Sequence, residues 1–95
     1  MTDISITVCA FANLRSILGA RTNVILSQGQ AVRDLLEILS ENHRCFREIV
    51  FDPEGRVNEG IEILVNGRII GQDKEFATKL QDGDQVFLFP TLLGG

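Results

Sequence analysis

The residues with the clearest chemical meaning are the two glycines that close the sequence, Gly94 and Gly95. A terminal carboxylate on glycine has no side chain beside it, and glycine accepts nearly any backbone conformation, so such an end can enter a narrow site in a partner. The carboxylate is ionised at neutral pH and is a poor electrophile, so it must be joined to a leaving group before a nucleophile attacks it. The alternative is coincidence, because 9 of the 95 residues are glycine and chain ends are often disordered.

Other candidates for chemistry are sparse. Cys9 and Cys45 form no CxxC pair, and two thiols are too few for a four-thiolate cluster. Cys9 is expected to pack as a small hydrophobic residue, the alternative being a redox or persulfide role, and Cys45 is also expected to pack. His43, the only histidine, stands where a helix is predicted to end. We therefore expect no metal, no permanently bound cofactor and no catalytic site, and the chain is predicted to be a covalent carrier.

The composition excludes several classes of protein. A net charge of −4, from 13 acidic and 9 basic residues, lacks the basic excess of a nucleic-acid-binding domain. Runs of apolar residues are too short to span a membrane. The opening Met1-Thr2-Asp3-Ile4 has an acid where a signal peptide carries basic residues. These features predict one small cytoplasmic domain without nucleic-acid or membrane partners.

Alternating apolar residues predict the strands that must position the terminal glycines. The first strand is expected over 4–9, with Ile4, Ile6 and Val8 on one face. Further strands are expected over 22–26, 62–65, 68–70 and 85–89.

The turn and the last strand carry specific signals. Asn66-Gly67 is the preferred two-residue hairpin turn, because both positions need a positive φ. In the last strand Val86 and Leu88 share one face, while Phe87 and Phe89 share the other. Two apolar faces predict a central strand.

One main helix is predicted over 32–42. Its apolar residues recur at i, i+3, i+4 and i+7, namely Val32, Leu35, Leu36 and Leu39. Asn13 is expected to cap a short helical turn that Gly19 stops. A second apolar cluster, over 46–51, has helix-like or irregular spacing.

The order of these elements predicts the architecture. Two strands, a helix, a hairpin and a final strand indicate an α+β fold of the β-grasp, ubiquitin-like type, a mixed sheet of about five strands with one main helix on one face. The first and last strands are expected to be parallel neighbours. The predicted division is a β-grasp domain over 1–90 and a C-terminal Gly-Gly segment over 91–95.

The sequence resembles the MoaD/ThiS family of ubiquitin-like sulfur carriers, over essentially its whole length. The residues that carry the resemblance are Leu80-Gln81-Asp82-Gly83-Asp84-Gln85-Val86-Phe87-Leu88-Phe89-Pro90, Gly94-Gly95, Val65-Asn66-Gly67 and Phe11-Ala12-Asn13-Leu14-Arg15. The residues Thr91, Leu92 and Leu93 replace the second proline that often precedes the glycines in MoaD. Extra length between 46 and 60 resembles the long, archaeal type of MoaD-like protein.

The resemblance implies a reaction at Gly95 and a set of partners. An ATP-dependent activating enzyme of the MoeB/ThiF type would adenylate the Gly95 carboxylate, and a sulfur nucleophile would then convert it to a thiocarboxylate. The leading expectation is the small subunit of molybdopterin synthase, which donates sulfur within a MoaE-like large subunit. Alternatives are sulfur delivery to cysteine or thiamin synthesis, conjugation to lysines as a protein modifier, and a plain β-grasp interaction domain.

The segment before the glycines is predicted to bind partners. Five extended residues, 91–95, span roughly 17 Å at most, which suits a buried active site. Leu92 and Leu93 are expected to dock in partner pockets with Thr91 and Gly94 alongside, the alternative being that they fold back on the domain's own sheet. Pro90, Phe89 and Phe11 are predicted to extend this contact.

Overall fold

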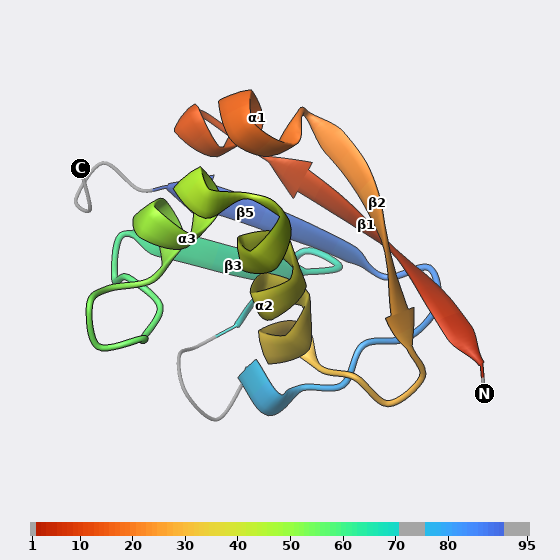
Figure 1. Cartoon of the computed structure of the whole chain (residues 1–95). Helices are drawn as coiled ribbons and strands as arrows, with labels where there is room; N and C mark the ends of the chain where they lie inside the picture. Colours follow the sequence, from red (N-terminus) through yellow and green to blue (C-terminus); the bar gives the residue numbers. More distant parts are fainter. Residues whose placement is uncertain (1, 71–75, 91–95) are drawn as a thin grey trace.

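The computed structural model describes residues 2–70 and 76–90, and Figure 1 shows the elements in order. They are β1 (Asp3–Ala10), α1 (Asn13–Leu18), β2 (Arg21–Ser27), α2 (Val32–Asn42), α3 (Arg44–Val50), β3 (Ile61–Val65), β4 (Arg68–Ile70) and β5 (Gln85–Pro90).

One mixed sheet organises the domain. Its five strands lie in the order β2-β1-β5-β3-β4. The β1 and β5 strands are parallel, and the other neighbours are antiparallel. The predicted β-grasp arrangement is confirmed, including the parallel first and last strands and the central place of β5.

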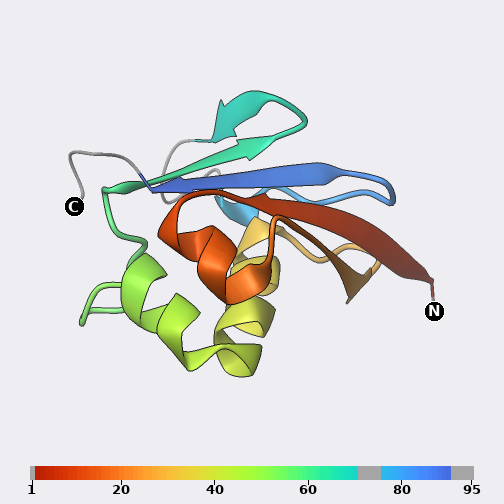
Figure 2. The same ribbon diagram turned by 90° about the horizontal axis from the view of Figure 1, so that it is seen from above.

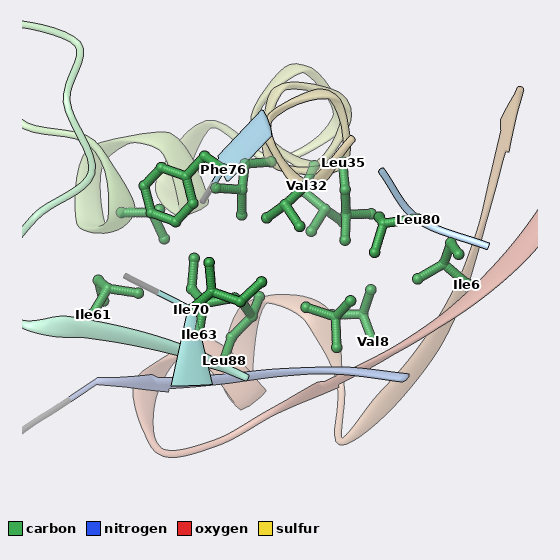
Figure 3. Close-up of a cluster of buried hydrophobic side chains, with 14 of the residues drawn as sticks. Ile6, Val8, Val32, Leu35, Ile61, Ile63, Ile70, Phe76, Leu80 and Leu88 are labelled. Atoms are coloured by element: carbon green, nitrogen blue, oxygen red, sulfur yellow. The ribbon is translucent and has the colours of Figure 1, made fainter. Parts of the chain in front are cut away.

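The three helices cover a single face of the sheet, as Figure 2 shows. Their apolar residues meet the inward-facing residues of the strands in one core, which Figure 3 displays. Ile6 and Val8 from β1 and Leu35 from α2 are all fully buried in it. The predicted alternation of β1 and the Val32–Asn42 helix are therefore confirmed. Such a shared apolar core is the main favourable term in folding.

The structure decides between the alternatives for the 46–51 cluster and corrects two expectations, for Cys45 and for Asn13. Residues 46–50 of the cluster lie in helix α3, in which Phe46 and Val50 are buried one turn apart, and Phe51 is its C-cap. Cys45 lies in its first turn and is exposed, so the expectation that it packs is wrong. Asn13 does not cap α1, because the N-cap position is held by Ala12.

The hairpin turn forms as predicted. Asn66 and Gly67 have φ values of 52° and 86°, the left-handed region that a tight hairpin turn requires of both central residues. No helix in the described part of the chain is long and apolar enough to cross a bilayer.

Candidate functional site

The candidate site begins at the C-terminal end of β5. This strand lies between β1 and β3, and β1 pairs with it up to Leu88 while β3 pairs with it up to Pro90. The residues predicted to react or to bind partners beyond this point, Gly95, Gly94, Leu93, Leu92 and Thr91, lie outside the described residues.

The start of β5 is held by a polar network. Asp84 accepts a hydrogen bond from the Asn66 side-chain amide at 2.9 Å, and its other carboxylate oxygen accepts one from the Gln81 N–H at 2.9 Å. The Asn66 Oδ1 in turn accepts the N–H of Gln85 at 2.9 Å. The β3–β4 hairpin and the entry to β5 are therefore locked in one register.

The Leu-x-x-Gly-Asp-x-Val pattern is explained by this entry. Leu80 and Val86 are buried in the core, and Gly83 has a φ of 88°. Asp82 adds a hydrogen bond from the Ser5 N–H to its Oδ1 at 2.7 Å. The motif therefore sets where β5 begins and its register against the hairpin.

Three aromatic rings, Phe11, Phe87 and Phe89, form what we call the aromatic platform. Phe11 and Phe89 stack face to face, with ring centroids 4.1 Å apart and planes inclined by 7°. Phe87 lies 6.5 Å from Phe89 and 6.4 Å from Phe11. The structure thus brings the predicted residues Phe11 and Phe89 together, directly before Pro90.

The platform lies on the face of the sheet that the helices leave open. Val86 and Leu88 point into the helix-covered core, and alternation along β5 directs Phe87 and Phe89 to the opposite side. Phe11 remains 38% exposed, so its ring is available to a partner.

The backbone around Phe11 explains how it reaches β5. The Phe11 N–H donates to the Leu88 carbonyl at 3.2 Å, one step beyond the last β1–β5 pair. Ala12 then adopts φ 54° and ψ −131°, a region that residues with a side chain rarely occupy. This strained residue turns the chain sharply from β1 into α1.

Strand register extends the platform into an apolar strip. Phe87 lies between Cys9 on β1 and Leu64 on β3, and Leu64 is paired with Ile69 on β4. Ile69 is 59% exposed and Cys9 is buried. The predicted packing of Cys9 is confirmed.

Sequence reasoning missed Phe87, Leu64 and Ile69 as members of this surface. The alternation of β5 signals Phe87, because it shares a face with Phe89. Leu64 and Ile69 give no such signal, because their place depends on the pairing of β3 with β5, which local sequence does not encode.

The aromatic rings and exposed apolar side chains of this surface are suited to binding. Among residues 2–70 and 76–90, no group of three or more metal-ligating side chains converges. His43 joins α2 to α3, with its N–H donating to the Leu39 carbonyl at 3.0 Å and its carbonyl accepting the Phe46 N–H at 3.1 Å. The expectation that it marks a helix end is confirmed.

A hollow of about 140 Å³ lies on the helical side, between α2 and the turn after α3. Its lining combines charged and apolar side chains, among them Arg33, Glu37, Phe51 and Arg56. It is separated from the aromatic platform by the sheet and the core.

Comparison with known proteins identifies the relatives of the chain. The model of the ThiS family matches residues 8–95. Small archaeal modifier protein 1 of Haloferax volcanii is 33% identical over 86 residues, which cover 90% of this chain and 94% of that protein. A protein of Archaeoglobus fulgidus, provisionally described as a sulfur carrier protein, is 31% identical over 64 residues, covering 67% and 73% of the two chains.

Solved structures share the architecture. The crystal structure of SAMP1 from Haloferax volcanii matches with a TM-score of 0.82 at 27% identity, over 96% of this chain and 99% of that one. A Pyrococcus furiosus protein, provisionally described as subunit 1 of molybdopterin converting factor, matches with a TM-score of 0.75 at 32% identity, over 94% and 99% of the two chains.

Proposed function

The chain belongs to the ThiS family of ubiquitin-like sulfur carriers and modifiers, and we propose that it carries sulfur as a thiocarboxylate on Gly95. The observation that carries the proposal is the position of the aromatic platform. The exposed Phe11 ring stacks on the half-buried Phe89 at the end of the central strand, immediately before the segment that leads to Gly95.

The proposed reaction has two steps. The Gly95 carboxylate attacks the α-phosphorus of ATP in a partner activating enzyme, giving an acyl-adenylate and releasing pyrophosphate. A sulfur nucleophile then attacks the acyl carbon and expels AMP. Hydrosulfide gives the C-terminal thiocarboxylate directly with loss of a proton, whereas a persulfide gives an acyl disulfide, from which a second thiol releases the thiocarboxylate by forming a disulfide with the persulfide's inner sulfur. Activation is needed because a carboxylate is a poor electrophile, and the activating enzyme supplies the ATP site and the catalytic groups.

The domain's own contribution is to bind the partner enzymes and to position the segment 91–95 relative to their active sites. Stacked aromatic rings supply large, rigid contact area, and aromatic residues are enriched at the centres of interfaces. The platform and its strip along Phe87, Leu64 and Ile69 would fit an apolar surface on the activating enzyme or on the sulfur-accepting enzyme. Because Pro90 follows Phe89 directly, docking of the platform fixes the point from which residues 91–95 start.

The leading acceptor is the pterin precursor of molybdopterin, with this chain as the small subunit beside a MoaE-like large subunit. The Pyrococcus furiosus relative, 32% identical, supports this choice through its description. A second function, conjugation of Gly95 to lysines of other proteins, is supported by the 33% identity to small archaeal modifier protein 1. Both functions begin with adenylation of the same carboxylate.

Intact-mass analysis of the protein from its native host tests the proposal. A species heavier by one oxygen-to-sulfur exchange supports the sulfur carrier, and its fragment ions must place the exchange on Gly95. Gly-Gly remnants on lysines of other proteins, without that species, would favour the modifier. If neither is found and a chain lacking Gly95 still complements loss of the gene, the proposal is wrong.

A further inference from the structure

The outer edge of β2 carries main-chain groups that the described part of the chain leaves without hydrogen-bond partners. The Ala10 N–H donates to the Ala20 carbonyl, and the Gln28 N–H donates to the Thr2 carbonyl. Both bonds fit the antiparallel register of β1 and β2. In an antiparallel pair of strands, every second pair of facing residues is hydrogen-bonded. Even-numbered residues of β2 therefore bond to β1, and odd-numbered ones point outward.

One end of this edge is already closed. The outward N–H of Ser27 donates to the Gln30 side-chain oxygen at 2.8 Å, and the Ser27 carbonyl accepts the Gln30 N–H at 3.1 Å. Three outward residues remain open, namely Arg21, Asn23 and Ile25. Each presents one donor and one acceptor.

The opposite edge of the sheet is different. Strand β4 is three residues long, and by the same alternation only Ile69 points its main chain outward. Edge strands are usually protected from pairing by proline or by charged residues, above all lysine. Strand β2 (Arg21–Ser27) contains no proline, glycine or lysine, and Arg21 is its single charged residue. The β2 edge is therefore the one fitted to receive another strand.

We propose that the β2 edge pairs with the β2 edge of a second copy of the chain, antiparallel and centred on Asn23. In this register Asn23 faces Asn23, and Arg21 faces Ile25 in both directions. All three outward residues of each copy are then bonded, which gives six main-chain hydrogen bonds across the seam. An antiparallel pairing centred on Val24 would bond only two of the three outward residues of each copy. A pairing centred on Ile25 would need the main chain of Ser27, which is already bonded to Gln30.

The side chains at this seam are compatible with the register. Arg21 lies beside the apolar Ile25 of the other copy rather than beside a like charge. Asn23 accepts a hydrogen bond from the Thr7 hydroxyl on its Oδ1 at 3.3 Å, which leaves its amide hydrogens to donate to the facing Asn23. On the helix side, half-buried Thr22 would cover half-buried Val24.

Self-pairing leaves the proposed sulfur-carrier surface accessible. Strand β1 separates β2 from β5 in the sheet, so β5, which carries Phe87 and Phe89, lies about 10 Å from β2, and the seam lies on the far side of β2. The two open faces would form one continuous surface. The proposal does not depend on the chemistry at Gly95.

Analytical ultracentrifugation of the full chain from about 10 µM to about 1 mM tests self-association. The range extends to high concentration because an interface made by one pair of short strands is small, and small interfaces are weak and transient. The matched variants are Ile25→Lys and Ile69→Lys, because the two isoleucines are equally exposed, at 59%, on opposite edges. We expect the wild-type mass to rise toward that of a dimer, Ile25→Lys to lower the association constant at least tenfold, and Ile69→Lys to behave as wild type. Circular dichroism checks that each variant is folded.

Cross-linking tests the register. In a Cys45→Ser background, Asn23→Cys would place two thiols on residues whose Cα atoms are about 5.5 Å apart, within disulfide range. Ile25→Cys would place them about 13 Å apart along the strands. We expect a disulfide-linked dimer from Asn23→Cys and at least tenfold less from Ile25→Cys.

Any one of three results would overturn the proposal. The first is a wild-type chain that stays monomeric up to about 1 mM. The second is self-association that is lost in Ile69→Lys but kept in Ile25→Lys, and the third is equal disulfide cross-linking of Asn23→Cys and Ile25→Cys. A monomeric chain whose Arg21, Asn23 and Ile25 amide resonances shift with an extended peptide would instead assign the edge to another protein.

Discussion

Phe11 and Phe89 meet face to face although they come from opposite ends of the chain. Their contact depends on the parallel pairing of β1 with β5, and on the bond from the Phe11 N–H to the Leu88 carbonyl. Because Phe11 is 38% exposed, its ring contributes more to a surface than to the core. The residue is therefore expected to matter for binding much more than for folding.

Replacing Phe11 with alanine tests that expectation. Phe11→Ala should weaken the complex with the activating enzyme by about tenfold or more, because aromatic residues at an interface centre commonly contribute over 1 kcal/mol. Calorimetric titration measures the affinity. The control is Ile25→Ala, an exposed apolar residue on the same face two strands away, which should bind normally; equal losses for both variants would contradict the role given to the platform.

Ala12 makes a second prediction for a single residue. Its φ of 54° and ψ of −131° are costly for a residue with a Cβ. Ala12→Gly should raise the free energy of unfolding by about 1 kcal/mol, since relief of strain exceeds the entropic cost of glycine. Urea denaturation measures it, and a fall in stability would show that the backbone here is not strained.

Among the elements, β5 has the greatest influence on the site. The Asp84 network sets its register against the hairpin, while Val86 and Leu88 anchor it in the core. Without this network β5 would keep its apolar anchors but lose the contacts that fix where it begins.

The strength of that network can be measured. Asp84→Ala removes the acceptors of the Asn66 side-chain amide and the Gln81 N–H, and should lower the free energy of unfolding by about 2 kcal/mol. Asp82→Ala, which removes one bond from the Ser5 N–H, should cost about half as much. Chemical denaturation of both variants provides the comparison, and a smaller loss for Asp84→Ala would assign the motif another role.

Prediction from sequence succeeded where the signal was local. The alternation of β1 and β5, the Asn66-Gly67 turn and the apolar spacing of α2 each depend on a few neighbouring residues. The sequence left helix and irregular structure both open over 46–51, because the seven residues of α3 give two buried positions, Phe46 and Val50, and no side-chain cap. The strip beyond Phe87 was missed because it depends on long-range pairing of β3 and β4.

At the scale of the whole molecule, the two faces of the sheet have different tasks. One face is sealed by three helices and holds the core, and Figure 2 shows the other face without helices. The open face carries the aromatic platform at the point where β5 ends. With the proposed docking surface on the open face, partners would bind without disturbing the packing that keeps β5 in place.

The proposed chemistry requires a free α-carboxylate on Gly95 when the activating enzyme acts. Adding one alanine after Gly95 places a methyl group next to the reacting carboxylate, so adenylation should fall at least a hundredfold while the melting temperature changes by less than about 1 °C. Pyrophosphate release with the purified activating enzyme and ATP measures the first quantity. Adenylation of the extended chain at the normal rate would show that a glycine carboxylate is not required.

The central place of β5 has a mechanical consequence. A carrier that is covalently held through Gly95 would be pulled along the axis of β5, the strand that ends at Pro90. Because β1 and β3 pair with β5 on its two sides, such a force loads both ladders in shear, so many hydrogen bonds must break together rather than one after another. The same pairing that aims the C-terminal segment thus makes the domain resistant to being unravelled from that end.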